Sequence, residues 1–268
     1  MPRIEQLSTS IINKIAAGEV IERPASAVKE LIENAVDAGA TRVDITIEEG
    51  GSHLIRVVDN GHGIAADQME LAIASHATSK IRSADDLFSV RTLGFRGEAL
   101  ASISEVSQMT LRSRTAEEEV GNILEINGGQ RSGLRPTGCP TGTLVEVRNL
   151  FYNTPVRRKY LKTVQTEMGH ITEAFTRIAL AYCDVHFSIK HNDRLMHDLP
   201  VVDNWKDRLA HFFGRDLAQG LIWVESEIDD VVISGYVANP TFFRSHTRMQ
   251  FLFLNGRHIR DRSLQHAL

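Results

Sequence analysis

Glu30 and Asn34 stand four residues apart in a segment whose apolar residues repeat at helical spacing. The sequence predicts a helix over residues 26–39, with Ser26 as its N-cap and Gly39 at its end. Residues with this separation lie on the same face of a helix, so both side chains would point to one side. A carboxylate there could act as a general base, and an amide oxygen could bind Mg²⁺.

The same predicted face carries Glu33 and Asp37, near the C-terminal end of the helix. An acid at that end opposes the helix dipole at a cost of about 0.3–1 kcal/mol, and Asn34 is a poor helix former. A face that breaks both local rules is a candidate functional site. The alternative is an ordinary solvated face, and Asp37 is equally consistent with a supporting partner in the site and with a surface residue.

Asp59 ends a predicted strand over residues 54–59, and Gly61 and Gly63 follow it. Glycines let the backbone approach a flat ligand closely, while the carboxylate accepts a hydrogen bond from an exocyclic amine such as that of adenine. Thr143, which begins another predicted strand, could line the same pocket with its hydroxyl group. The alternative is an ordinary glycine-rich loop.

Glycines also precede a predicted helix of small and apolar residues that begins near Ala99. Free amides and the positive end of the dipole at a helix N-terminus form a cradle for phosphate. The segment HATSK at residues 76–80 adds hydroxyl groups and a lysine, and the sequence contains no G-x-x-x-x-G-K-[ST] loop. The residues expected to bind nucleotide here are Thr78, Ser79, Lys80, Leu93, Gly94, Phe95, Arg96, Gly97, Glu98, Ala99 and Leu100.

The composition predicts a soluble globular chain, because 42% of the residues are hydrophobic and the mean hydropathy is −0.17. The sequence has no apolar run of about 18 residues and no signal-peptide core, so we expect no membrane segment and a cytoplasmic location. Cys139 and Cys183 form no C-x-x-C pair, which argues against a metal site or a disulfide. The net charge of −4 argues against a uniformly basic nucleic-acid-binding protein.

Two local basic patches could still contact nucleic acid. The first covers residues 157–162, and the second lies between residues 244 and 262, where five arginines accompany one acid, Asp261. A charge run is usually a solvated face. Phe251 and Phe253 alternate with leucines, which predicts a buried strand rather than a stacking surface. The candidate DNA-binding residues are Arg244, Arg248, Arg257, Arg260 and Arg262.

The sequence divides into two predicted domains, over residues 1–200 and 201–268. The polar segment 191–204, which contains a proline, is the predicted boundary. The predicted strands are 42–48, 54–59, 106–113, 143–147, 185–189, 222–225, 231–237 and 250–254, and further helices are predicted over 167–182 and 205–214. The sequence stops at Leu268 inside a helix-like segment, so we expect that the second domain is only partly present.

The motifs E-x-x-x-N, DNGHG, HATSK, LGFRGEALASI and GTLVEV, in this order, resemble the nucleotide-binding motifs of the GHKL ATPases. The stretches IAAGEVIERPASAVKELIENAVDAGA, GFRGEALASI and FYNTPVRRKYL are similar to one family within that superfamily, the MutL mismatch-repair proteins. The resemblance runs from about Ile4 to the last residue. It implies an α+β fold, with a Bergerat-type two-layer α/β sandwich and a mixed sheet followed by part of a ribosomal-protein-like α/β domain.

The resemblance also implies a slow ATPase that binds ATP and Mg²⁺. Glu30 would be the general base, Asn34 the Mg²⁺ ligand and Asp59 the residue that recognises adenine. The nucleotide state would gate self-dimerisation and the engagement of DNA, a MutS-like mismatch-recognition protein and downstream repair factors. Related ATPases place a lysine of the second domain against the γ-phosphate, and since the last lysine here is Lys206, we expect that lysine beyond residue 268.

Alternatives remain open. An ATP-gated binding module would trap nucleotide with negligible turnover. A histidine kinase would need a dimerising helical hairpin that bears an acceptor histidine, and neither His62 nor His76 stands in such a segment. A topoisomerase ATPase would need cleavage domains that the sequence does not contain. The expected location is the cytoplasm of a bacterium, at the nucleoid, or the nucleus of a eukaryote.

We expect weak, sequence-independent and salt-dependent binding to DNA, because the arginine patch offers charge but no base-reading helix. Charge reversal at Arg260 or Arg262 should weaken binding equally for all sequences. Each lost phosphate contact should flatten the log–log salt slope by about 0.9 on duplex DNA. Fluorescence anisotropy at several salt concentrations measures both effects. Binding that is unaffected by both reversals would move the site elsewhere, first to residues 157–162.

Overall fold

The chain folds as two units, each of which is described by itself. The first unit comprises Met1–Phe175 and Val185–Asp198, and the second comprises Thr176–Asp184 and Leu199–Leu268. Residues 176–184, which the sequence places in the first domain, therefore group with the second unit. The computed structural model describes residues 9–80, 92–94, 97–229, 231–242 and 249–267.

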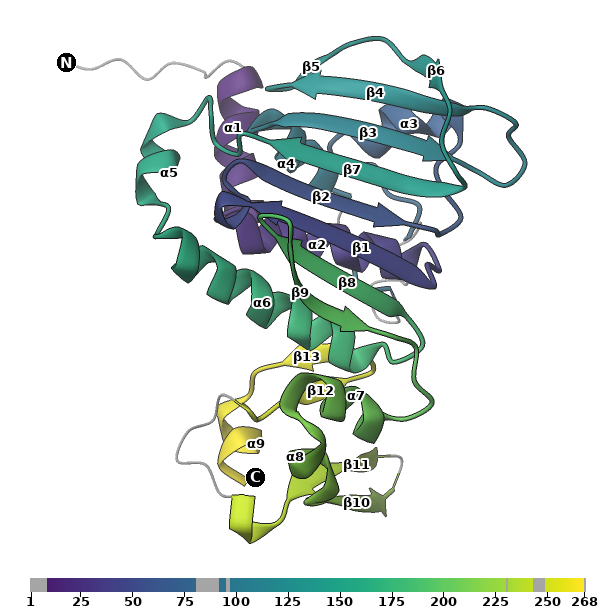
Figure 1. Ribbon diagram of the computed structural model, residues 1–268. Coiled ribbons are helices and arrows are strands. Elements are labelled where there is room, and N and C mark those ends of the chain that lie inside the picture. Colours follow the sequence, from purple (N-terminus) through teal and green to yellow (C-terminus); the bar gives the residue numbers. More distant parts are fainter. Residues whose placement is uncertain (1–8, 81–91, 95–96, 230, 243–248, 268) are drawn as a thin grey trace, which may run out of the picture. The chain divides into compact units, whose positions relative to one another are not determined.

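A mixed β-sheet forms the centre of the first unit (Figure 1). Its strands are β1 Arg42–Glu48, β2 Leu54–Asp59, β3 Gln108–Arg114, β4 Gly121–Asn127, β5 Gln130–Arg131, β6 Arg135–Thr137, β7 Gly142–Arg148, β8 His186–His191 and β9 Arg194–Leu199. They follow the order β5-β4-β3-β7-β2-β1-β8-β9, and β6 pairs with β4. β1 and β8 are parallel, whereas β1–β2, β2–β7 and β3–β7 are antiparallel. The predicted α+β class with a mixed sheet is confirmed.

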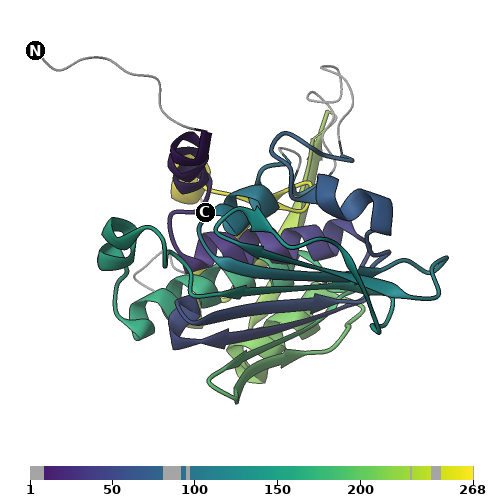
Figure 2. The ribbon, with the colours of Figure 1, turned by 90° about the horizontal axis from the view of Figure 1, so that it is seen from above.

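Helices lie against one face of this sheet, as two views of α1, α2 and α4 show (Figures 1 and 2). The helices of this unit are α1 Thr9–Val20, α2 Pro24–Asp37, α3 Met69–Ala72, α4 Ala99–Glu105, α5 Pro155–Tyr160 and the part of α6 Val164–Ala181 up to Phe175, with short 3₁₀ helices η1 Glu49–Gly51 and η2 Ala66–Gln68. Alternate strand residues such as Ile45 and Ile47 are buried, which gives the sheet one apolar face. Phe175 of α6 meets Phe187 of β8 edge to face, with ring centroids 6.0 Å apart. No helix in the described part of the chain has the length and apolar character to span a bilayer.

Helix α2 begins at Pro24, so the prediction that Ser26 is the N-cap is wrong. Proline suits the first turn because its fixed φ is helical and its missing N–H has no partner to lose there. Arg23 precedes it in extended conformation. The helix ends at Asp37, and Gly39 follows with a φ of +70°, which glycine adopts without strain.

The predicted boundary segment 191–204 contains strand β9, and the second unit resumes at Leu199 within that segment. Asn192 and Asp193 join β8 to β9 with φ values of +45° and +63°. Positive φ at both central residues is typical of a tight hairpin turn, and Asn and Asp tolerate it. Most side chains of β9 are exposed, so its sequence lacks the alternation that identifies a half-buried strand.

The second unit contains α7 Trp205–Phe213, α8 Arg215–Gln219, β10 Leu221–Ile228, β11 Val231–Ala238, the 3₁₀ helix η4 Pro240–Phe242, β12 Leu252–Leu254, β13 Arg257–Ile259 and α9 Arg262–Ala267. β10 and β11 pair in antiparallel fashion, as do β12 and β13. Arg208 of α7 is fully buried, and its guanidinium donates hydrogen bonds to the carbonyl oxygens of Cys183 at 2.9 Å and Leu199 at 3.2 Å. Arg208 thereby fixes α7 to the segment that follows α6 and to the end of β9.

Strand β12 differs from its prediction. It begins at Leu252 rather than residue 250, and Leu254 is 60% exposed, so the prediction of a buried strand is wrong. Among the predicted DNA-binding residues, Arg257 lies in β13, Arg260 follows that strand and Arg262 begins α9. Arg244 and Arg248 lie outside the described residues.

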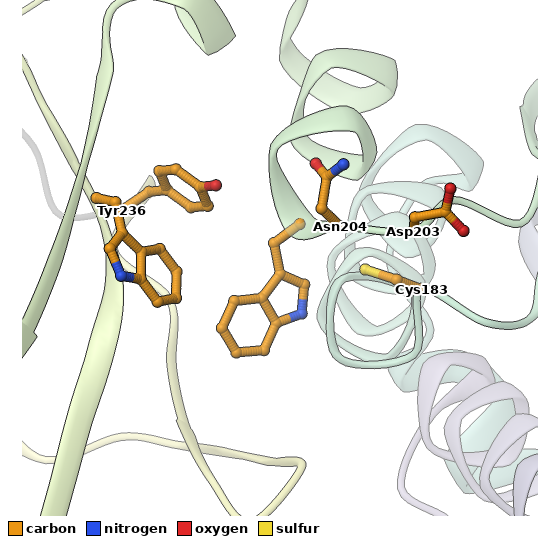
Figure 3. A pocket seen from close by; sticks show the side chains of 6 residues that line it. Cys183, Asp203, Asn204 and Tyr236 are labelled. Carbon is orange, nitrogen blue, oxygen red and sulfur yellow. The ribbon is translucent and has the colours of Figure 1, made fainter.

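An open cavity of about 360 Å³ lies in the second unit (Figure 3). Trp205 of α7 packs there beside aromatic residues of the β10–β11 ribbon, with ring centroids 6.2 Å apart for Trp205 and Trp223 and 5.0 Å for Trp223 and Tyr236. The lining residues are Cys183, Asp203, Asn204, Trp205, Trp223 and Tyr236. None of them is a predicted nucleotide-binding residue.

Gly142→Ala should destabilise the first unit by about 2 kcal/mol or more. Gly142 has a φ of +119°, and an added Cβ atom would lie 2.1 Å from the carbonyl oxygen of Asp59. A backbone oxygen cannot swing aside as a flexible side chain can, so the β2–β7 pairing must shift. Urea denaturation followed by circular dichroism gives the free energy of unfolding. Gly133→Ala is the control, since no heavy atom lies within 4 Å of its added Cβ, and equal losses in both variants would contradict the argument.

Candidate functional site

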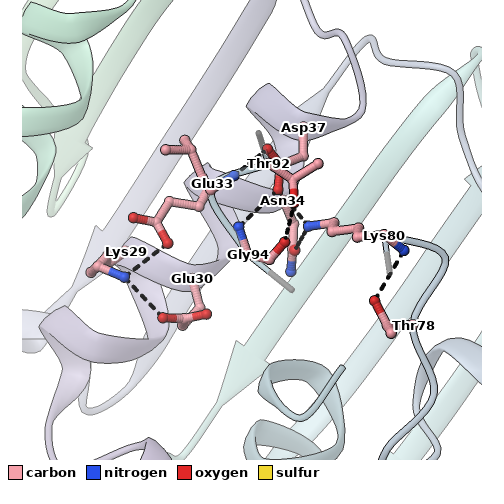
Figure 4. A network of polar contacts seen from close by, with 10 residues as sticks. Lys29, Glu30, Glu33, Asn34, Asp37, Thr78, Lys80, Thr92 and Gly94 are labelled. Atoms are coloured by element: carbon pink, nitrogen blue, oxygen red, sulfur yellow. Dashed lines mark hydrogen bonds and ion pairs between the residues drawn. The ribbon is translucent and has the colours of Figure 1, made fainter. Parts of the chain in front are cut away.

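Helix α2 presents Glu30, Asn34 and Asp37 on its polar face (Figure 4). Leu31 and Ile32, on the opposite side of the helix, are buried. Burial of that apolar stripe fixes the rotation of the helix about its axis. The three polar side chains therefore face the same side of the helix, as the sequence predicts.

The Lys80 ammonium lies between two oxygen atoms of α2. Its Nζ is 2.9 Å from Oδ1 of Asn34 and 2.6 Å from Oδ2 of Asp37. The Asp37 carboxylate also accepts hydrogen bonds from the backbone N–H groups of Leu93 at 2.8 Å and Gly94 at 3.0 Å. The Asp37 side chain is only 7% exposed, so it belongs to a polar network and not to open surface.

Glu30 lies one turn before Asn34 and is partly exposed (Figure 4). The Lys29 ammonium is 3.0 Å from Oε1 of Glu30 and 2.8 Å from Oε2 of Glu33. Burial raises the pKa of Glu33 above its ordinary value, and the neighbouring Lys29 ammonium opposes that rise. Burial lowers the pKa of Lys29, but Glu30 and Glu33 together raise it above its ordinary value.

Asp59 lies at the end of β2, beside the start of β7. Its Oδ1 accepts hydrogen bonds from the N–H groups of Gly61 at 2.9 Å and Thr143 at 3.3 Å. Burial raises the pKa of Asp59 above its ordinary value, although these two amides act in the opposite direction. Among the described residues none donates a hydrogen bond to Oδ2, so that oxygen can accept one from a ligand amine.

Ser113 of β3 is a site residue that the sequence alone does not reveal. Its Oγ donates a hydrogen bond to the carbonyl oxygen of Gly142 at 2.8 Å, accepts one from the Ile64 N–H at 2.8 Å and lies 3.0 Å from Oγ1 of Thr143. Gly63 passes β3 so closely that an added Cβ would lie 2.1 Å from a backbone carbonyl oxygen. Ser113 and Gly63 therefore fix the loop after Asp59 against the sheet.

The two stretches predicted to bind phosphate lie side by side. Gly97 has a φ of +63°, and an added Cβ would lie 2.2 Å from the carbonyl oxygen of Ala77. Nδ1 of His76 is 3.1 Å from Oε1 of Glu98. These contacts bring the HATSK segment to the start of α4.

The remaining predicted residues are placed as follows. Oγ1 of Thr78 accepts a hydrogen bond from the Lys80 N–H at 3.2 Å, and Ser79 is exposed. Ala99 and Leu100 form the first turn of α4. Phe95 and Arg96 lie outside the described residues.

The phosphate end of this site suits a magnesium–nucleotide complex. An amide oxygen of Asn34 and a carboxylate oxygen of Asp37 converge on one cation, the ammonium group of Lys80. Mg²⁺ prefers oxygen ligands and commonly takes only one or two of them from the protein. Lys80 and the amides of Leu93 and Gly94 supply hydrogen-bond donors of the kind that phosphate accepts.

Two known protein families match separate parts of the chain. Residues 21–137 match the family described as "Histidine kinase-, DNA gyrase B-, and HSP90-like ATPase". Residues 209–268 match the family described as "DNA mismatch repair protein, C-terminal domain". The first match covers α2, the Asp59 loop and the start of α4, and the second lies within the second unit.

The chain is also similar to individual proteins. It is 51% identical over 266 residues to the DNA mismatch repair protein MutL of Xanthomonas oryzae pv. oryzae (strain PXO99A), which covers 99% of this chain and 43% of that protein. The MutL protein of Xylella fastidiosa (strain 9a5c) is 50% identical over the same shares of the two chains. The chain thus spans less than half the length of these relatives.

Two solved structures resemble the chain. The Aquifex aeolicus MutL ATPase domain complexed with ADP matches with a TM-score of 0.72 and 33% identity, over 92% of this chain and 87% of that one. The N-terminal domain of a DNA repair protein matches with a TM-score of 0.79 and 27% identity, over 94% of this chain and 80% of that one.

Asp59→Asn should gain stability relative to the unmodified chain as the pH rises. Burial raises the pKa of Asp59 above its ordinary value of 3.8, so ionisation of this carboxyl group costs the folded state more free energy than the unfolded state. The Asp59 contribution is therefore most favourable below the unfolded pKa and is lost as the pH rises through the folded pKa. Urea denaturation between about pH 4 and pH 8 tests this. Asp67→Asn, at an exposed position, controls for loss of a charge. If the difference in unfolding free energy between Asp59→Asn and the unmodified chain does not change with pH, the raised pKa of Asp59 is contradicted.

Proposed function

The chain belongs to the MutL family of DNA mismatch repair proteins and carries the GHKL ATPase domain of that family, and from this premise we propose that it binds and slowly hydrolyses ATP with Mg²⁺. The observation that carries the proposal is the polar face of α2. Glu30, Asn34 and Asp37 stand there in succession, and Asn34 and Asp37 meet Lys80 and the amides of residues 93–94. This set combines a base, oxygen ligands for a cation and donors for phosphate.

Asp59 binds the adenine ring in this proposal. Its Oδ1 is occupied by the amides of Gly61 and Thr143, which fixes the carboxylate and leaves Oδ2 for the exocyclic amine. Thr143 adds a hydroxyl group that Ser113 orients. An added Cβ at Gly63 would lie 2.1 Å from the Arg114 carbonyl oxygen, so glycine there lets the loop after Asp59 stay close to β3. The solved relative that holds ADP supports a nucleotide site in this fold.

Lys80 and the amides of Leu93 and Gly94 bind the phosphates. All three now donate to Asp37, and phosphate oxygens accept hydrogen bonds from the same kinds of groups. Asn34 offers its Oδ1 to Mg²⁺, which would neutralise charge on the phosphate oxygens. Asp37 and the phosphates accept from the same donors, so binding of the phosphates would draw these donors away from Asp37.

Glu30 orients and deprotonates the attacking water. It stands on the same helix face as Asn34, one turn away, so a water at its carboxylate lies near the phosphate end of the site. A positioned base of this kind contributes about 10²–10⁴-fold to a rate. Binding does not depend on Glu30, because adenine and phosphate contacts come from other residues.

The wider role is proposed from the family and not from the site. The nucleotide state would control pairing of two copies of the chain and the engagement of DNA, of a MutS-like mismatch-recognition protein and of downstream repair factors. The relatives are DNA mismatch repair proteins, and the second unit carries the basic residues Arg257, Arg260 and Arg262, which supports the engagement of DNA. The proposed location is the cytoplasm, where the chromosome of a bacterium lies.

Glu30→Ala should lower ATP hydrolysis by about 10²-fold or more and leave ATP affinity within about twofold, because it removes the base and no binding contact. Asn34→Ala should instead weaken Mg²⁺-dependent binding. Phosphate release gives the rate, and isothermal titration with a non-hydrolysable ATP analogue gives the affinity. Glu70→Ala, which removes an exposed acid of α3, is the matched control.

Hydrolysis by Glu30→Ala at the native rate would show that Glu30 is not the base. Tight nucleotide binding by the unmodified chain without measurable phosphate release would instead favour an ATP-gated binding module. Absence of nucleotide binding by the unmodified chain would overturn the proposal as a whole.

A further inference from the structure

Lys29 joins two acids of α2 that the proposed mechanism treats separately (Figure 4). Its single Nζ atom is 3.0 Å from Oε1 of Glu30 and 2.8 Å from Oε2 of Glu33. One ammonium group therefore connects the carboxylate proposed as the base to a second carboxylate one turn further along.

Glu33 is the anchored end of this bridge. The residue is only 8% exposed, and Lys29 is the cation within ion-pair distance of it among the described residues. A buried carboxylate has few alternative positions, and removal of its partner would leave a buried charge unpaired. The position of Glu33 consequently fixes the position of the Lys29 ammonium.

Glu30 is the more exposed end. Its side chain is 27% exposed and has three rotatable bonds, so it can adopt several rotamers unless a contact selects one. The Lys29 ammonium supplies such a contact. A base must hold its oxygen within hydrogen-bond reach of the water that it activates, so selection of one rotamer acts directly on the rate.

Helix stability alone does not account for this arrangement. A Lys–Glu pair with lysine on the N-terminal side is the less favourable order for two residues one turn apart, because it opposes the helix dipole. Glu33 is also buried, so its pair with Lys29 differs from the solvent-exposed ion pairs that add little to stability. The pair with Glu33 compensates the burial of that carboxylate, whereas the contact between Lys29 and the partly exposed Glu30 adds little to the stability of the helix.

We propose that Lys29 is a positioning residue for ATP hydrolysis, which holds Glu30 in its working rotamer while Glu33 anchors Lys29. The proposal rests on the assignment of Glu30 as the base. Lys29 has no part in nucleotide affinity, because adenine and phosphates are bound by other residues.

Lys29→Met and Lys29→Arg test the proposal. Lys29→Met keeps a long side chain but removes the ammonium group, and should lower kcat by about 10- to 100-fold, with the Kd for a non-hydrolysable ATP analogue within about twofold. Lys29→Arg can span two carboxylates and should restore most of kcat. Lys190→Met, at an exposed position of β8, is the matched control and should leave kcat unchanged.

The same substitution in the Glu30→Ala chain separates positioning from other roles. If Lys29 acts only through Glu30, Lys29→Met should lower kcat no further in that background. A further fall as large as the fall in the unmodified chain would overturn the proposal. So would a loss of ATP affinity equal to the loss of kcat, which would place Lys29 on the nucleotide itself.

The outcomes also distinguish this proposal from the one on which it rests. If Glu30→Ala hydrolyses ATP at the native rate, the assignment of Glu30 as the base is wrong. If Glu30→Ala is inactive but Lys29→Met hydrolyses ATP at the native rate, only the role of Lys29 is overturned. Thermal denaturation reports whether each variant folds. If Lys29→Met does not fold, Glu33→Met and Glu33→Gln replace it, because Met removes every acceptor for Lys29 and Gln removes only the charge. A kcat for Glu33→Met equal to that of the unmodified chain would then overturn the proposal.

Discussion

The proposed phosphate end of the site depends on a single carboxylate, that of Asp37. Lys80, Leu93 and Gly94 lie in stretches without helix or strand, far from α2 in the sequence, and all three donate hydrogen bonds to Asp37. Bonds to an ionised acceptor are roughly twice as strong as those between neutral groups. The Asp37 side chain is nearly excluded from solvent, so water competes little for these donors. The place of Asp37 on α2 therefore decides where the lysine and the amides of the site lie.

The position of α2 is in turn set by the sheet. Its apolar stripe packs toward strands whose alternate residues are buried, and Asp59 stands at the end of one of those strands, β2. β7 pairs with β2 so that Thr143 stands opposite Asp59, and β3 pairs with β7 so that Ser113 stands opposite Thr143. The residues proposed to bind adenine and the α2 residues of the proposed phosphate end thus stand on regular elements that share one core. Side chains that are held by such a core lose little conformational freedom when a ligand binds, which favours affinity.

The sequence predicts the elements with strong periodicity and misses those whose signals compete. The apolar stripe of α2 and the alternation in β1 and β2 identify these elements and place Glu30, Asn34 and Asp59 correctly on them. Ser26 gives a misleading signal for the start of α2, because Pro24 is an equally suitable first residue and the helix begins there. The register of β3 against β7 places Ser113 beside Thr143. The burial of Glu33 gives the bridge at Lys29 its fixed end. Register and burial are set by partners far away in the chain, so local pattern does not contain them.

Asp37 and a phosphate group need the same donors, and this competition has a consequence for the proposed function. If Lys80 turns from Asp37 to a phosphate, a nearly buried carboxylate loses its ion pair, which is strongly unfavourable unless another cation replaces the ammonium. Asn34 stands beside Asp37 with an oxygen that already contacts the ammonium, so a metal ion bound there would supply that replacement charge. Binding of the nucleotide then raises the affinity for the metal ion, and by thermodynamic linkage the metal ion raises the affinity for the nucleotide by the same factor. The donors at residues 93–94 belong to the same exchange, so whichever anion they bind, Asp37 or phosphate, sets the conformation of the backbone that carries them.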